Sequence, residues 1–134
     1  MVKLPNPAYD HADYLAILTN TTLGNNIVVD KKPEEPNAII SVHNTNGYPS
    51  IKTLGTNEED IRKPGLMVSI RGNPGDYANS RAKADIIFAA LKKKGNYMVN
   101  GNYYKSCLVV GDLGKPEYDE KNRPNWYINF ELIM

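Results

Sequence analysis

Residues 125–133 read NWYINFELI, and this stretch decides the fold class. Large apolar side chains occupy every second position, with more polar ones between them. The apolar set is Trp126, Ile128, Phe130 and Leu132. Alternation with a period of two is typical of a strand that buries one face. We therefore expect a sheet in which the even-numbered side chains of this strand point into the core.

A helix is predicted to pack on that strand. The apolar stripe of residues 77–91 consists of Tyr77, Ala84, Ile87 and Leu91. Asn73-Pro74 is a good helix start, and Asp76 in the first turn suits the helix dipole. Lys92 to Lys94 suit the negative end of that dipole, and Gly95 is the expected cap.

The remaining elements follow from similar patterns. Asn6-Pro7 predicts the start of a first helix that stops at Gly24. Apolar and β-branched runs predict strands at 26–29, 38–43 and 66–71. Residues 97–110 are predicted to form a hairpin or a bent strand around Asn100-Gly101, a favoured two-residue turn. The expected order is α-β-β-β-α-β-β, an α+β domain with a largely antiparallel sheet packed by two helices. A chain of 134 residues fits one domain spanning its whole length.

Residues 44–65 show neither the alternation of a strand nor the apolar stripe of a helix. Asn, Gly, Pro, Thr and charged residues dominate, and the apolar residues are few. A connection of this length in a compact domain is either functional or flexible. We expect a long loop that is mobile in the isolated subunit and becomes ordered on a partner.

Composition excludes several classes of protein. A net charge of +1 gives no field that would gather nucleic acid or an anionic membrane over distance. Cys107 is the only cysteine, which rules out an internal disulfide and a cysteine-rich zinc site. Residues 1–10 lack the apolar run of a signal peptide, and no stretch approaches the roughly 20 apolar residues of a membrane span. We therefore expect a soluble protein without a membrane partner.

No motif predicts catalysis. Gly72 to Asp76 lies where a phosphate-binding loop would lie, but Pro74 removes an N–H donor and Asp76 would repel an anion. His11 and His43 have no metal-ligand spacing, and Cys107 lies in an apolar run typical of an inert buried thiol. A Cys-His dyad would need a neighbour that the sequence does not reveal. We expect no catalytic residue, no metal and no cofactor.

A family resemblance lies in the C-terminal half, about residues 65–134. A strand ending at Arg71 leads through a short turn into a Tyr77-Ala78 helix start. Then follow Gly111-Asp112-Leu113-Gly114, the run from Asp119-Glu120 to Arg123, and a final aromatic strand. This arrangement resembles the minor capsid and tail-completion proteins of bacteriophages. The length and the helix-first order are similar to tail terminators and tail-to-head joining proteins of long-tailed phages.

The resemblance implies a structural virion protein rather than an enzyme. It implies a homo-oligomeric ring, expected to be a hexamer, that caps the tail tube and joins it to a head-completion or stopper protein. DNA would pass through the ring without specific binding. The protein would be assembled in the cytoplasm of the host bacterium and reside at the head–tail interface of the virion.

We expect the interface residues to come from the long loop and the closing segment. They are Tyr48, Glu58, Glu59, Asp60, Arg62, Lys63, Tyr118 and Arg123. Tyrosine is enriched at protein interfaces. We expect the three acids to face the channel, and Arg62 and Lys63 to face a neighbouring subunit.

Two other functions remain open. The first is a head-side connector or stopper subunit. The second, from another class, is a small nucleic-acid-binding module that uses the Gly72 to Gly75 turn and Lys92 to Lys94. Phosphate contacts would give DNA binding a steep dependence on salt concentration, which separates this module from the structural roles.

Overall fold

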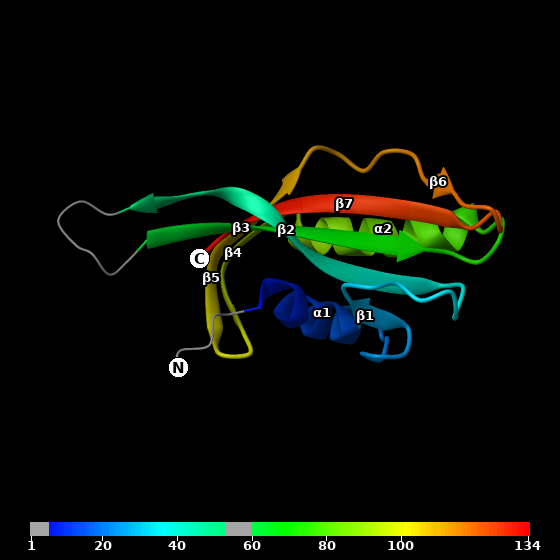
Figure 1. The fold of residues 1–134 in the computed structure, drawn as a ribbon, viewed down its shortest axis with the longest axis horizontal. Helices are drawn as coiled ribbons and strands as arrows, with labels where there is room; N and C mark the ends of the chain where they lie inside the picture. Colours follow the sequence, from blue (N-terminus) through cyan, green and yellow to red (C-terminus); the bar gives the residue numbers. More distant parts are fainter. Residues whose placement is uncertain (1–5, 53–59) are drawn as a thin grey trace.

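The computed structural model describes residues 6–52 and 60–134, with only the backbone of residues 48–52, 60 and 61 (Figure 1). Its helices and strands follow in chain order. They are α1 (Pro7–Leu18), β1 (Ile27–Val29), β2 (Ile39–Lys52), β3 (Asp60–Arg71), α2 (Tyr77–Leu91), β4 (Lys93–Val99), β5 (Asn102–Val110), β6 (Glu117–Tyr118) and β7 (Pro124–Ile133). The predicted order of elements is confirmed, with the segment predicted over 97–110 formed by the two strands β4 and β5 and with the two-residue β6 in addition.

The strands form one mixed sheet in the order β1-β2-β3-β7-β5-β4, and β6 pairs with the start of β7. β1 runs parallel to β2, and the other pairs are antiparallel. The predicted hairpin is β4–β5, and both turn residues, Asn100 and Gly101, have positive φ, as that turn requires. The predicted α+β class is confirmed.

The core lies between one face of the sheet and both helices. Ala8, Ala12 and Leu15 of α1 and Ala84, Ile87 and Leu91 of α2 pack on that face. All four even-numbered apolar side chains of β7 are buried in it, as predicted. Trp126 lies opposite Ile70 of β3 in the register of the sheet. We call this covered side the inner face and the other side the outer face.

The apolar stripe predicted for α2 is confirmed at three of its four residues, and the prediction is wrong for the first, Tyr77. Ala84, Ile87 and Leu91 are fully buried, whereas Tyr77 is 49% exposed and touches Trp126 only with the edge of its ring. Ser80 takes the buried place, and its Oγ accepts a hydrogen bond of 2.9 Å from Trp126 Nε1. A buried indole N–H needs such a partner, which explains a polar residue in the stripe.

The helix ends differ in part from the expectation. Asn6 caps α1 as predicted, since its side chain accepts from the backbone N–H of Tyr9. α2 is instead capped by Asp76, and Asn73-Pro74 lies in the turn before it. No glycine caps the end of α2, because Lys93 pairs with Leu108 at once and the sheet ladder takes up its backbone groups.

The segment predicted as a long loop contains strands. Thr45 pairs with Gly65, Tyr48 with Lys63 and Lys52 with Asp60, so β2 and β3 continue as a two-stranded ribbon that projects from one end of the molecule (Figure 1). Register shifts on both sides of Tyr48 interrupt the alternation, which is why the sequence pattern was not legible. We call residues 45–52 and 60–65 the arm. Its mobility stays a prediction.

Leu91→Ala tests the packing of α2. Leu91 is fully buried, so its truncation should lower the free energy of unfolding by roughly 2–5 kcal/mol. Ile86 of the same helix is 48% exposed, and Ile86→Ala is the matched control, with an expected change near zero. Denaturant unfolding monitored by the fluorescence of Trp126, the only tryptophan, measures both. Equal effects of the two substitutions would contradict this packing.

Candidate assembly interface

The outer face of the sheet carries exposed apolar side chains in its middle. Leu108 and Val110 of β5 and Tyr127 of β7 are each about two-fifths exposed. The register puts Val110 opposite Asn129 and Leu108 opposite Glu131, on the face that no helix covers. A water-facing sheet surface is normally polar, so contiguous apolar side chains there are typical of a contact with another protein.

The arm continues this surface. A groove of about 400 Å³ lies at its base, lined by Thr45 to Gly47, Gly65, Val110 and Asn129. The two strands approach so closely that a Cβ at Gly47 would collide with the carbonyl oxygen of Lys63. β7 and the residue after it flank only the base of the arm, through the Gly65–Glu131 pair and the bond from Met134 to Arg62, so among the described residues no third strand flanks its outer part. A two-stranded ribbon is marginally stable in water by itself, which favours contact with a partner.

Four of the eight predicted interface residues belong to the arm. Tyr48 and Asp60 lie on its strands, while Glu58 and Glu59 lie outside the described residues. Lys63 is half-buried. Arg62 is held within the subunit, because its carbonyl oxygen accepts a 2.9 Å hydrogen bond from the N–H of Met134 and its side chain lies beside the Met134 sulfur.

Tyr118 and Arg123 lie at the other end of the molecule, beyond the last residue of β3. The twelve residues of β3 separate the two ends by about 35 Å, at a rise of about 3.3 Å per residue. The structure therefore divides the predicted interface residues between opposite ends. Tyr118 is half exposed on β6 and is available for contact.

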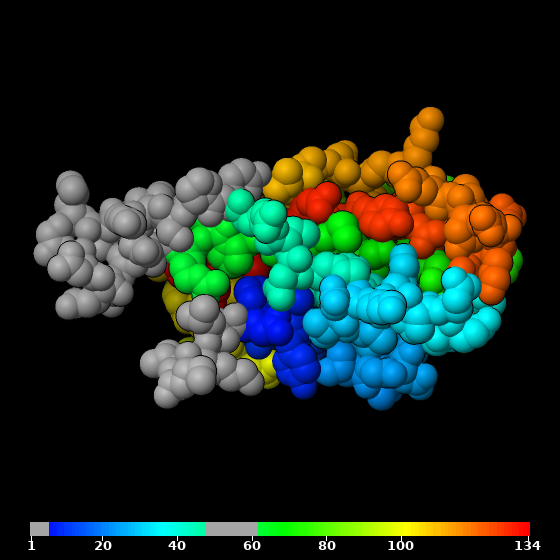
Figure 2. All heavy atoms as spheres, viewed as in Figure 1, coloured from blue at the N-terminus to red at the C-terminus, as the bar shows by residue number. Residues whose placement is uncertain are grey.

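Arg123 is not available for contact, because only 3% of it is exposed. Its guanidinium forms ion pairs with Asp119 at 2.8 Å and with Glu34 at 3.2 Å. Hydrogen bonds and charge from Arg123 hold the pKa of Asp119 below its usual range. Lys121 does the same for the pKa of Glu34, with Arg123 contributing. Arg123 thus fastens the loop 30–37 to the segment 117–123, and Figure 2 shows the two in contact at this end.

Arg71, which the sequence marked only as the end of a strand, is a second buried arginine. It donates from Nη2 to the carbonyl oxygens of Pro33, Glu34 and Pro36 and from Nε to that of Asn37. These bonds give the proline-containing loop one conformation over the end of the outer face. The partners are more than 30 residues apart in the chain, so no local pattern predicts them.

Lys32 anchors the same loop to the outer face. Its Nζ lies 2.8 Å from both Ser69 Oγ and Asn125 Oδ1 and stands over the ring of Tyr127. Burial, followed by the charge of Arg71, lowers the pKa of Lys32 to about 8. The apolar patch is therefore bordered by a partly buried amine at this end.

One constellation looks like a catalytic triad and is not one. Ser41 Oγ lies 2.8 Å from His43 Nε2, and the Asp30 carboxylate lies near the other ring nitrogen, Nδ1. Ser41 is fully buried, and its hydroxyl donates to the carbonyl oxygen of Asp30, so His43 Nε2–H donates to Ser41 rather than taking its proton. His43 Nδ1 is 3.7 Å from the Asp30 carboxylate, too far for a hydrogen bond. The group fixes the turn after β1.

The possible Cys-His dyad is also absent as a reactive pair. Cys107 is fully buried, and burial raises the pKa of its thiol to about 12. Tyr97 lies between it and His11, whose ring bonds to the Tyr97 hydroxyl. A protonated, inaccessible thiol is not a nucleophile.

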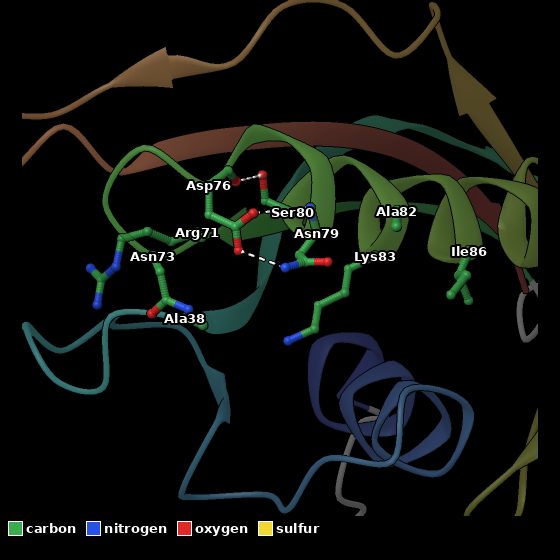
Figure 3. Close-up of a pocket in the computed structure, with 10 residues that line it drawn as sticks. Ala38, Arg71, Asn73, Asp76, Asn79, Ser80, Ala82, Lys83 and Ile86 are labelled. Carbon is green, nitrogen blue, oxygen red and sulfur yellow. Dashed lines mark hydrogen bonds between the residues drawn. The ribbon is translucent and has the colours of Figure 1, made fainter.

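The turn before α2 lines a groove of about 430 Å³ (Figure 3). The Asp76 carboxylate accepts from the backbone N–H and the side-chain amide of Asn79, so the helix start already holds an anion. A phosphate would meet this charge, and the groove does not support the nucleic-acid alternative. Of the predicted basic run, Lys92 and Lys93 are exposed, whereas Lys94 stacks over the rings of Tyr14 and Tyr97.

Within residues 6–52 and 60–134, no group of three His, Cys, Asp or Glu side chains is placed to hold a metal ion. Among the same residues, neither helix is long and apolar enough to cross a membrane.

Known proteins share this fold. A chain from the virion of a native gene transfer agent particle has a TM-score of 0.57 at 13% sequence identity, covering 89% of this chain and 82% of that one. A second solved chain has a TM-score of 0.59 at 10% identity, covering 94% and 91%. At such identities the likeness shows the fold alone. No curated protein sequence matches the chain.

A protein-family model decides the family. The model described as bacteriophage tail terminator protein matches residues 14–134, from the middle of α1 to the last residue. The match includes the whole sheet, the arm and both ends of the molecule. By that match the chain belongs to the bacteriophage tail terminator family, a family of structural proteins of the phage tail.

Proposed function

We propose that this tail terminator assembles into a six-fold ring that closes the head-proximal end of the tail tube and receives a head-completion or stopper protein on its other side. Two features of the subunit support this role. It has two chemically different ends, the arm and the charged loops that Arg71 and Arg123 hold. It also has an apolar patch and groove on the outer face beside the arm.

The arm is the observation that carries the proposal. A ribbon without a covering layer gains stability when its backbone and side chains pack on another chain. In a ring, each arm lies on the next subunit, so one surface binds a different surface of the neighbour. Such a head-to-tail contact closes into a ring when the rotation between subunits fits.

The channel of the ring is proposed to carry Glu58, Glu59 and Asp60. Passing DNA is held by cationic walls, because each phosphate contact releases counterions. An acidic lining avoids this, and the net charge of +1 agrees with it. Lys63 would then face the neighbouring subunit. The Arg62 guanidinium would also face it, with the nitrogen atoms that do not contact the Met134 sulfur.

The role is tested with purified protein and tail tubes from the same phage. Electron microscopy should show a ring at one end of each tube, and native mass spectrometry should give six copies. Rings bound to portal-containing heads but not to tubes would favour the head-side connector. DNA binding with a steep salt dependence, and no binding to tubes, would favour the nucleic-acid module.

Shortening the arm tests how the ring is held together. Thr45 and Gly65 are cross-strand partners, so residues 46–64 can be replaced with an Asn-Gly turn. We expect a variant with native Trp126 fluorescence that stays monomeric at concentrations where the natural protein forms rings, measured by analytical ultracentrifugation. Rings of normal stability in the shortened variant would contradict the role of the arm.

Charge reversal tests the channel. Replacing Glu58, Glu59 and Asp60 with lysine should leave folding and ring formation intact but impair DNA delivery, measured as infectivity and DNA release. The matched control changes Asp112, Glu117 and Glu120, which are exposed and lie outside the arm, to lysine. An equal loss from both triple variants would show a general charge effect and sink the channel assignment.

A further inference from the structure

Two ionisable side chains at the start of α1 are buried against the β4–β5 hairpin. The carboxylate of Asp10 accepts hydrogen bonds from the Tyr104 hydroxyl and from the side-chain amides of Asn100 and Asn102. His11, the next residue, is fully buried and contacts Tyr97 and Tyr104 edge-to-face. The helix start is therefore held to the hairpin by polar groups.

Both ring nitrogens of His11 are occupied. Nδ1 lies 2.8 Å from the carbonyl oxygen of Pro7, and Nε2 lies 2.8 Å from the hydroxyl of Tyr97. A carbonyl oxygen only accepts, so Nδ1 carries the proton of the neutral ring. Nε2 of the neutral ring is then the acceptor for the Tyr97 O–H.

The apolar contact of α1 is small. Its fully buried hydrophobic side chains are Ala8, Ala12 and Leu15, and two of these contribute only a methyl group each. Pro7 is also buried, and Tyr14 and Ala16 pack on the core in part. Apolar burial stabilises in proportion to area, so the polar cluster carries a large share of the docking of the first turns. The tail-terminator match begins at residue 14, so Asp10 and His11 precede it.

We propose that His11 is a proton-operated latch, whose protonation releases the first turns of α1 from the β4–β5 hairpin while the sheet and α2 stay folded. A proton from solvent binds Nε2, and the Tyr97 O–H loses its acceptor. The charge of the imidazolium is then buried between the rings of Tyr97 and Tyr104, where it loses its hydration. Opening of the helix start lets the charge reach solvent.

Charged and titratable groups face His11 from every element around it. They are Asp10 from α1, Lys94 and Tyr97 from β4, and Tyr104 and Cys107 from β5. Asp10 favours the protonated ring, but its carboxylate is already engaged by three donors. The Lys94 ammonium lies over the ring of Tyr97, and burial raises the pKa values of Tyr97, Tyr104 and Cys107, which stay neutral.

The direction of the pH effect follows from the buried ring. Burial lowers the pKa of His11 below 6.5, against the opposing effects of the Pro7 carbonyl and Asp10. A released His11 therefore binds protons more readily than a docked one. The latch is fully effective above pH 6.5 and weakens as the pH falls below that value towards the lower pKa of the docked ring.

Hydrogen exchange of the intact protein at pH 7.5 and 5.5 tests the latch. Protection factors are compared, because they remove the intrinsic pH dependence of exchange. One proton taken up with a pKa of 6.5 on release favours opening about tenfold between these pH values. Amides of residues 10–14 should lose protection by about this factor, while those of α2 and the fluorescence of Trp126 stay unchanged.

The two histidines supply the matched variants. His11→Gln keeps an acceptor and a donor but does not titrate, so its protection factors at residues 10–14 should not depend on pH in this range. His43→Gln, on the half-buried histidine of the outer face, should retain the tenfold change. A tenfold change that persists in H11Q overturns the latch, as does a change in Trp126 fluorescence in parallel with the loss of protection.

Direct titration keeps the test decisive if His11→Gln fails to fold. The ring protons of His11 in the natural protein are followed by NMR against pH. A midpoint below 6.5 together with pH-dependent protection in α1 supports the latch. A midpoint at or above 6.5 overturns it, because the docked helix would then gain stability from the proton.

Discussion

The burial of one face of β7 is the constraint on which the rest of the structure depends. β7 lies between β3 and β5, and α2 covers it. Its largest side chain, Trp126, fills the space under α2 and needs a partner for its indole N–H, which Ser80 supplies. Helix, neighbouring strands and register are fixed together, because a slip of one residue would turn the whole apolar set to the other face.

Both helices lie on the inner face of the sheet, so no helix covers the outer face. The loop 30–37 covers only the end near Arg71, where Lys32 reaches across to Ser69 and Asn125. The middle of the outer face keeps Leu108, Val110 and Tyr127 in contact with water. For a protein of the phage tail, which works among other subunits, such a surface and the adjoining arm are places where further chains can be bound.

Buried charges decide where the loops and the first helix lie. A buried charge without a partner is costly, and here each one is surrounded by groups of the opposite kind. Arg71 binds backbone carbonyls, Arg123 binds two carboxylates, and Asp10 binds two amides and a phenol. Each set joins segments that are distant in the chain, so these clusters fix loop 30–37 and the start of α1 without a large apolar contact.

The sequence by itself determined the order of the elements, the α+β class, the buried face of β7 and the Asn6 cap of α1. All of these depend on side-chain periodicity or on a residue's own backbone preference, which are local. Only the tertiary structure decided that residues 44–65 contain the strands of the arm, that Arg123 is buried and that Tyr118 lies about one strand length from the arm. Those outcomes depend on cross-strand pairing and on ion pairs between residues far apart in the chain. Such pairings have no periodic signature, because the energy that selects them appears only when the distant partners meet.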